Sequence, residues 1–225
     1  MTDTPRKSQH DPSVRPENLG ADGNGGGNGN SKADFVFFTY NGEEQVGLFY
    51  SQDGASDGWR LVWHQADDGQ DAYSGGWLNE LVTDSISIDD HISAIAHDGK
   101  IYASVKDASD NLWLLAGSPG NWQEPIKLDK GGSRPVTILD ETQNRIYVAY
   151  QESTSNGDVI LRSASLDDLV FDQPRSIISG GDVKNPQVTS HVVGEETDNY
   201  FLIVARDGDD VWRNGVSLDD PDLLA

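Results

Sequence analysis

The sequence predicts an all-β protein made of a repeated four-stranded unit. From residue 33 onward, short runs of β-branched and aromatic residues alternate with Gly, Asp, Asn and Ser, and no helical period of useful length occurs. Asp outnumbers Glu by 29 to 9, and Asp suits turns whereas Glu suits helices. The strand runs also recur along the chain, which indicates a repeat architecture.

Each predicted repeat begins with a strand that we expect to be the innermost of its unit. These inner strands begin 57, 44 and 52 residues apart and cover residues 35–40, 92–97, 136–139 and 188–193. A second strand ending in an acidic residue follows, at residues 46–53, 101–107, 146–152 and 201–207. A third strand comes after a polar turn, at residues 59–64, 112–116, 159–163 and 211–216. Three repeats continue with an outer strand, at residues 77–82, 122–128 and 171–178.

Four strands in roughly 40 to 50 residues are typical of a β-propeller blade. The sequence therefore predicts a β-propeller of about four four-stranded blades. Propellers close into rings of roughly four to eight blades. Because the fourth repeat ends at Ser217 without an outer strand, a partial or atypical ring is preferred over a closed ring of four.

The first 32 residues differ from the rest in composition. They contain no Trp, Tyr or Phe and end in the Gly- and Asn-rich run GADGNGGGNGNS. With so little apolar surface to bury, we expect residues 1–32 to be a disordered leader and residues 33–225 to be the propeller domain. The leader's acidic and basic residues cancel, so the formal charge of -22 belongs to the predicted propeller.

Charge and composition exclude several classes of protein. A strongly acidic domain repels the phosphates of nucleic acid and anionic membrane surfaces. No segment approaches eighteen consecutive apolar residues, so none is expected to span a bilayer. The absence of Cys removes disulfides, thiolate metal sites and thiol nucleophiles. The N-terminus lacks the apolar core of a secretory signal.

Several short motifs, in this order and spacing, resemble a family of secreted bacterial β-propellers of the uncharacterised, sialidase-like or BNR type. The motifs are VGLFYSQ from Val46, DDH from Asp89, GKIYASVK from Gly99, GNW from Gly120, SRPV from Ser133 and VW from Val211. The resemblance covers about three-quarters of the chain. It implies a propeller fold and an extracellular location, and it brings no reaction. Because no signal peptide is visible, a cytoplasmic location stays open.

Residues that precede the inner strands are the main candidates for a ligand site. In a propeller these positions converge at the mouth of the central channel, on the same face as the turns between second and third strands. Acids, a His, an Arg and an Asn there would bind hydroxyls or a carboxylate, with Arg134 as a two-pronged donor. The alternative is that Asp and Asn serve only as turn residues and Pro only starts a strand. The ligand-binding candidates are Asp89, Asp90, His91, Arg134, Asn185 and Lys106.

A catalytic role for His91 with Asp90 is the weaker hypothesis. A carboxylate that orients an imidazole can make it a general base. No nucleophile is identifiable by spacing, and neighbouring residues on a strand point to opposite faces. The remaining His in or beside strands, His64, His97 and His191, are expected to be packing or surface residues rather than metal ligands.

Asp-rich turns raise the alternative of a calcium site. Calcium takes six to eight oxygen ligands, and such loops supply several. Turn chemistry alone also explains Asp-Gly and Asn-Gly pairs, and no full EF-hand pattern occurs. The candidate metal ligands are Asp53, Asp57, Asp107, Asp110, Asp207 and Asp209.

The six Trp residues are expected mainly in the packing between sheets. Trp77 and Trp122, which follow Gly or Gly-Asn, are the two expected to be accessible, where a Trp face would suit a sugar ring.

The sequence as a whole favours a non-catalytic extracellular recognition module that binds a glycan or another polymer at the acidic channel-mouth face. No cofactor is required, although calcium would bridge to an acidic ligand. The alternatives are a sialidase-like glycoside hydrolase or lyase, complete or fragmentary, and an assembly module that self-associates through an open sheet edge.

Overall fold

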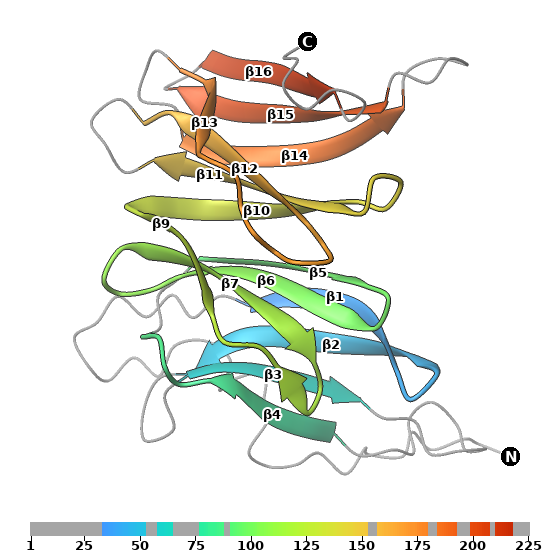
Figure 1. Cartoon of the computed structure of the whole chain (residues 1–225). Helices are drawn as coiled ribbons and strands as arrows, with labels where there is room; N and C mark the ends of the chain where they lie inside the picture. Colours follow the sequence, from blue (N-terminus) through green and yellow to red (C-terminus); the bar gives the residue numbers. More distant parts are fainter. Residues whose placement is uncertain are drawn as a thin grey trace, which may run out of the picture.

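The structure is a computed structural model that describes residues 33–52, 58–64, 77–87, 91–152, 157–179, 184–192, 199–207 and 210–217. Every regular element in these ranges is a β-strand, and the strands form four antiparallel sheets (Figure 1). The all-β prediction is confirmed. The leader predicted for residues 1–32 lies outside the described residues.

The four sheets follow one another along the chain, and each begins with its inner strand. Sheet 1 contains β1 (Ala33–Tyr40), β2 (Glu43–Gln52), β3 (Gly58–His64) and β4 (Trp77–Thr83). Sheet 2 contains β5 (Ile92–His97), β6 (Lys100–Lys106), β7 (Asn111–Ser118), β8 (Asn121–Trp122) and β9 (Ile126–Lys130). Sheet 3 contains β10 (Gly132–Asp140), β11 (Arg145–Glu152), β12 (Val159–Ser165) and β13 (Arg175–Ile178). Sheet 4 contains β14 (Lys184–Val192), β15 (Asn199–Asp207) and β16 (Asp210–Ser217).

The outer strands are the elements that differ from the sequence prediction. A single strand at residues 122–128 is wrong, because β8 and β9 pair separately with β7 and Pro125 lies between them. Proline has no N–H to donate to a strand ladder, so it interrupts the edge strand here. The third outer strand, β13, is shorter than the predicted segment and begins at Arg175. Among the described residues sheet 4 has no outer strand, as predicted.

Two tight hairpins join inner to second strands. The turn between β1 and β2 is Asn41-Gly42, with φ of 53° and 83°, and the turn between β5 and β6 is Asp98-Gly99, with φ of 47° and 72°. Positive φ at both central residues is the hairpin geometry that Asn-Gly and Asp-Gly adopt with least strain. Asp98, one of the many Asp residues, therefore helps to set the pairing register of β5 and β6.

Three apolar layers hold the sheets together. Val36, Leu61, Ile101 and Val105 belong to the layer between sheets 1 and 2. A second layer joins sheets 2 and 3, and a third joins sheets 3 and 4. Each inner sheet is thus covered on both faces, as in the blades of a propeller.

The sheets form an open arc rather than a closed ring. β5 lies beside β1 and β10, and β10 lies beside β14, so the inner strands gather along one line. Figure 1 shows sheet 1 at the bottom and sheet 4 at the top, at opposite ends of this arc. The described residues thus form four blades of a partial β-propeller. No helix in the described part of the chain is long and apolar enough to cross a membrane.

Candidate functional site

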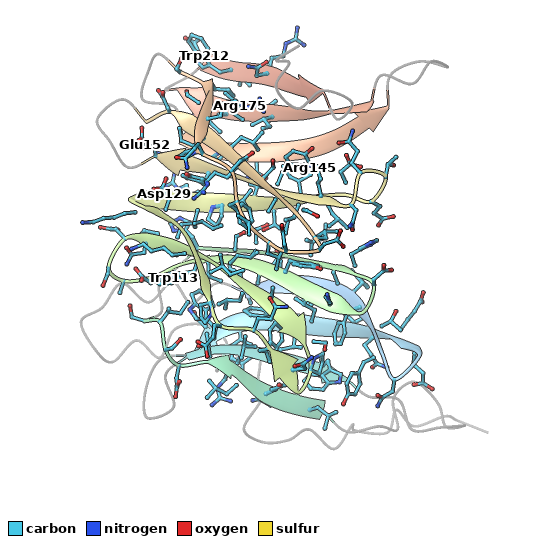
Figure 2. All side chains as sticks on the ribbon, viewed as in Figure 1. Trp113, Asp129, Arg145, Glu152, Arg175 and Trp212 are labelled. Carbon is cyan, nitrogen blue, oxygen red and sulfur yellow. The ribbon has the colours of Figure 1, made fainter. Side chains whose placement is uncertain are left out.

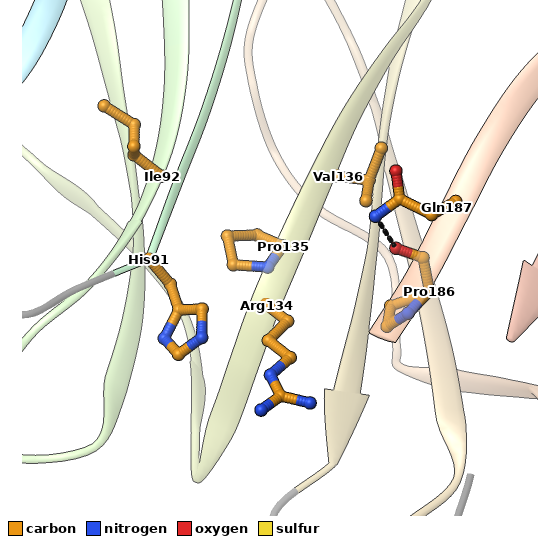
Figure 3. A pocket seen from close by; sticks show the side chains of 7 residues that line it. All are labelled: His91, Ile92, Arg134, Pro135, Val136, Pro186 and Gln187. Atoms are coloured by element: carbon orange, nitrogen blue, oxygen red, sulfur yellow. Dashed lines mark hydrogen bonds between the residues drawn. The ribbon is translucent and has the colours of Figure 1, made fainter. Parts of the chain in front are cut away.

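A cavity of about 240 Å³ lies where three inner strands begin. Its lining comes from sheets 2, 3 and 4, and Figure 3 shows the side chains arranged around it. The lining residues are His91, Ile92, Arg134, Pro135, Val136, Pro186 and Gln187. This is the convergence of strand starts that the propeller prediction anticipates.

A β-bulge in β10 positions Arg134. The pairing with β11 shifts by one residue between Ser133 and Val136, which places Arg134 and Pro135 in the bulge. Arg134 has a φ of 52°, in the left-handed region that residues other than Gly rarely adopt. Bulges re-aim side chains beside functional sites, and such backbone strain concentrates there. The guanidinium lies at the cavity in Figure 3.

A second bulge of the same kind begins β14. Its pairing with β15 shifts by one residue between Lys184 and Gln187, around the Asn185-Pro186 dipeptide. A Pro in a bulge sacrifices no ladder hydrogen bond, because the bulged residue is unpaired. The Gln187 side chain donates from Nε2 to the carbonyl oxygen of Pro186 at 2.9 Å, which fixes its amide at the cavity wall.

His91 enters the cavity from sheet 2. It directly precedes β5, and its carbonyl oxygen accepts a hydrogen bond from the backbone N–H of Lys106 at 3.1 Å. This bond extends the pairing of β5 with β6 by one residue and holds the His91 backbone. The half-buried ring lies on the same side of the cavity as Arg134 (Figure 3).

The described lining combines hydrogen-bonding groups with apolar surface. Arg134, His91 and the Gln187 amide supply donors, and Gln187 also offers an acceptor. Pro135, Pro186 and the two aliphatic side chains supply apolar contact. Among the described residues no Asp or Glu lines the cavity.

The structure brings two of the predicted ligand-binding residues together and separates a third. His91 and Arg134 line one cavity. Lys106 is paired with His91 through its backbone but does not line the cavity, and its Nζ pairs with the Asp110 carboxylate at 2.9 Å. Asp89 and Asp90 lie outside the described residues. The side chain of Asn185 is likewise not described, although its backbone belongs to β14.

Five lining residues were not among the predicted ligand-binding residues: Ile92, Pro135, Val136, Pro186 and Gln187. They follow the predicted positions by one or two residues along the same strands. The Arg134-Pro135 and Asn185-Pro186 pairs were the available signal, because a Pro near a strand start indicates a bulge that shifts the following side chains.

The carboxylate of Asp107, a candidate metal ligand, already accepts hydrogen bonds from residues of its own turn. Its carboxylate accepts the backbone N–H groups of Ser109 and Asn111, both at 2.8 Å, and the Trp113 Nε1–H at 2.8 Å. The Asn111 amide donates to both carboxylate oxygens as well. Burial of Asp107 acts to raise its pKa, but these hydrogen bonds outweigh it and the pKa lies below its usual value. The geometry explains Asp107 as a turn residue.

The other candidate metal ligands form no cluster in the described part of the chain. Asp110 is exposed and pairs with Lys106. Asp53, Asp57 and Asp209 lie outside the described residues, and of Asp207 only the backbone is described. Within the described ranges, no group of three or more His, Asp or Glu side chains could hold a metal ion.

Trp122, expected to be accessible, is only partly so. Its ring packs edge-on against Phe49 with centroids 5.8 Å apart, and its Nε1–H donates to Glu80. Trp212, in contrast, is 40% exposed and lies on the outermost strand at the top of Figure 2. The side chain of Trp77 is outside the described residues. His97 lies beside Asp98 and Glu141 at the surface, and the side chains of His64 and His191 are not described.

Neither a protein family nor a curated protein matches the sequence. Solved structures do match in shape. A triple arginine-to-alanine mutant of AofleA from Arthrobotrys oligospora matches with a TM-score of 0.57 at 10% identity, covering 83% of this chain and 54% of that one. The chain therefore spans about half the length of AofleA.

Two further structures match less closely. The lectin of Aleuria aurantia, described as a six-bladed β-propeller with a fucose recognition mode, gives a TM-score of 0.49 at 14% identity, over 84% of this chain and 64% of that one. A xylan β-1,4-xylosidase from Bacillus halodurans gives 0.49 at 16% identity, over 85% and 41%. At these identities a similarity shows the fold at most. The four successive antiparallel sheets, with their inner strands side by side, define the chain as a β-propeller-type protein.

Proposed function

We propose that this chain is a non-catalytic recognition module that binds a glycan in the cavity between sheets 2, 3 and 4. The observation that carries the proposal is the convergence of His91, Arg134 and Gln187 on one cavity that is otherwise lined by Pro and aliphatic side chains. Ligand sites typically combine such an apolar lining with a few placed polar groups.

The chemistry of the lining suits a sugar ring. The Arg134 fork and the Gln187 amide would hydrogen-bond to neighbouring hydroxyls, and the rings of Pro135 and Pro186 would contact the apolar C–H surface. A volume of about 240 Å³ is close to the lower end of small-molecule sites, so we expect one sugar residue of a longer chain to occupy it. The strained backbone at Arg134 supports a role beyond packing.

A glycan array followed by calorimetry tests the proposal. We expect the best glycan on the array to bind the Arg134→Met variant at least about tenfold more weakly, because this variant keeps the aliphatic stem and loses the donors. Lys100→Met, which removes an exposed charge at the start of β6 in sheet 2, is the matched control and should bind as the unmodified protein does. Equal affinity for all three proteins would contradict the proposal.

Two further arms of the same experiment separate the alternatives. Binding measured with and without a chelator shows whether calcium participates. If the protein hydrolyses chromogenic glycosides and His91→Ala abolishes this turnover, the chain is a glycoside hydrolase rather than a non-catalytic recognition module. If no glycan on the array binds, the assembly module that self-associates through an open sheet edge becomes the better-supported function.

A further inference from the structure

Arg134 differs from the other half-buried arginines in the described part of the chain. Arg60 and Arg145 donate to neighbouring side chains, Arg162 donates to three backbone carbonyl oxygens, and Arg175 also has a partner. No hydrogen bond or ion pair joins the Arg134 guanidinium to another described residue, and its nitrogen atoms are not enclosed by the protein. Its five N–H groups are therefore open to a ligand in the cavity between sheets 2, 3 and 4.

This isolation is unusual in so acidic a chain. The chain has 38 Asp and Glu residues against 16 Lys and Arg, so carboxylates are its commonest charged groups. Lys106, which follows His91 in the strand pairing of sheet 2, is paired with Asp110 at 2.9 Å. Around Arg134, in contrast, the described lining contains no Asp or Glu. The positive charge of Arg134 is therefore available to a ligand rather than used by the fold.

The hydrogen-bonding groups of the described lining are mostly donors. Arg134 only donates. The Gln187 amide nitrogen already donates to the carbonyl oxygen of Pro186 at 2.9 Å, which leaves its Oε1 as an acceptor. A sugar hydroxyl brings one donor and two acceptor sites, whereas a carboxylate brings acceptors only. A lining whose strongest group is a charged donor fork therefore fits a carboxylate better than a set of hydroxyls.

The shape of the cavity suits an anionic sugar in particular. A guanidinium fork and a carboxylate are both planar, so they join through two parallel hydrogen bonds that are stronger than neutral ones. Pro135 and Pro186, both buried, supply apolar wall for the C–H surface of a sugar ring. A uronic acid is a hexose whose C6 is a carboxylate, so it combines such a surface with one planar anion. A cavity of about 240 Å³ accommodates one residue of this size.

We propose that the sugar residue bound in the cavity is a uronic acid whose carboxylate pairs with Arg134. The inference rests on the proposed glycan-binding function and names the group that the Arg134 fork takes. The formal charge of -22 does not prevent this contact. At physiological ionic strength, exposed charges more than about 8 Å apart are largely screened, whereas a partly buried pair in contact is screened much less. The acidic surface therefore weakens the approach of an acidic polymer more than it weakens the bound contact.

Matched oligosaccharides test the charge of the ligand separately from its shape. Oligomers of galacturonate, glucuronate and mannuronate would each be compared with the same oligomer after reduction of its carboxylates to hydroxymethyl groups. Calorimetry in the presence of a chelator measures both affinities and excludes bridging by calcium. We expect at least one acidic oligomer to bind about tenfold or more tightly than its reduced form, because reduction removes the charged two-pronged pair and leaves the ring.

Variants of Arg134 separate ion pairing from hydrogen bonding. Arg134→Gln keeps an amide donor and removes the charge, so we expect the preference for the acidic oligomer to fall to about twofold or less. Arg134→Lys keeps the charge without the fork and should retain an intermediate preference. Lys100→Met removes one exposed positive charge at the start of β6 and should keep the full preference. Circular dichroism and the urea midpoint would check that each variant is folded.

The outcomes distinguish this inference from the function on which it rests. Equal affinity for the acidic and reduced oligomers would overturn the uronic acid and leave the glycan-binding module in place. A preference that survives Arg134→Gln would also overturn it, because the carboxylate would then bind elsewhere. Binding of a sulfated neutral oligosaccharide but of no uronate oligomer would assign the fork to a sulfate instead. If neither these oligomers nor any glycan on the array binds, the recognition module fails together with this inference.

Discussion

The carboxylate of Glu80 joins the first two blades by accepting the indole N–H of Trp122. The Trp122 Nε1 to Glu80 Oε1 distance is 3.0 Å, and the backbone N–H of Gly120 donates to the same oxygen at 2.7 Å. Glu80 lies in β4 and Trp122 in β8, so the contact connects the outer parts of two sheets whose inner strands β1 and β5 already lie side by side. Blade-to-blade cohesion therefore extends from the centre of the arc to its rim.

Replacing Glu80 with Met should destabilise this junction. The substitution keeps length and removes both acceptors, leaving the half-buried Trp122 N–H without its partner. Hydrogen bonds to a charged group contribute about 1.5 to 3 kcal/mol, so we expect the free energy of unfolding in urea to fall by roughly that amount. Glu124→Met, at an exposed Glu in the same region, is the control and should change stability by less than about 0.5 kcal/mol. A smaller loss for Glu80→Met than for the control would refute the role of this contact.

Asp107→Asn should destabilise the second blade in a pH-dependent way. The amide would present a donor to N–H groups that now donate to the carboxylate, so we expect a loss of about 2 to 3 kcal/mol at pH 7. Because the pKa of Asp107 is lowered by folding, its contribution is present above the unfolded pKa of about 3.9 and disappears as the pH falls through the folded pKa.

Urea unfolding at pH 7 and at about pH 3 measures this difference. The gap in stability between Asp107→Asn and the unmodified protein should narrow at the lower pH. Asp98→Asn is a matched control at a side chain that is 88% exposed, in a turn where Asn suits the positive φ. A gap that stays constant with pH would show that the substitution acts through packing rather than through the carboxylate.

Tyr150→Phe should lower stability at neutral pH and flatten its decline at high pH. The Tyr150 hydroxyl donates to Asp129 Oδ2 across the interface of sheets 3 and 2, and burial together with this carboxylate raises the Tyr150 pKa. Losing the donor should reduce the free energy of unfolding by about 1 to 2 kcal/mol at pH 7.

The alkaline behaviour follows from the direction of the Tyr150 pKa. Its stabilising effect is complete below the unfolded pKa of about 10 and is lost as the pH rises toward the folded value, because only the unfolded chain releases the proton. Unfolding measured at pH 7 and at about pH 11 should therefore show a smaller decline for the variant. An equal decline would assign the alkaline loss to the other buried tyrosines.

The sequence predicts the architecture better than the site, for a physical reason. Strand runs and turn residues recur in every repeat, so the positions of β5 and most second and third strands follow from local pattern. The turn at Asp107 shows where the sequence pattern is ambiguous. The same Asp-rich run fits a calcium-binding loop and a turn whose carboxylate is hydrogen-bonded by the turn itself. Only the observed bonds from Asn111 and Trp113 distinguish them.

The cavity lining depends on bulges that shift the register by one residue. Arg134 and His91 were predicted as neighbours from the convergence of inner strands, which topology alone supplies. Gln187 was missed because the bulge around Pro186 decides which following side chain reaches the cavity. The partial burial of Trp122 could not be predicted, because its partner Glu80 lies 42 residues earlier in the chain and no local signal connects them.

The backbone of Arg134 allows its structural and binding roles to be separated. Arg134→Ala and Arg134→Gly both remove the guanidinium from the cavity, but only the Gly variant relieves the left-handed conformation at a φ of 52°. A residue with a Cβ in this region is strained by about 1 kcal/mol or more, so we expect the Gly variant to be more stable than the Ala variant by about 1 kcal/mol in urea unfolding. Both variants should lose glycan affinity equally. Equal stability of the two variants would show that the bulge relaxes without its arginine, and unequal affinity would show that the bulge backbone itself contacts the ligand.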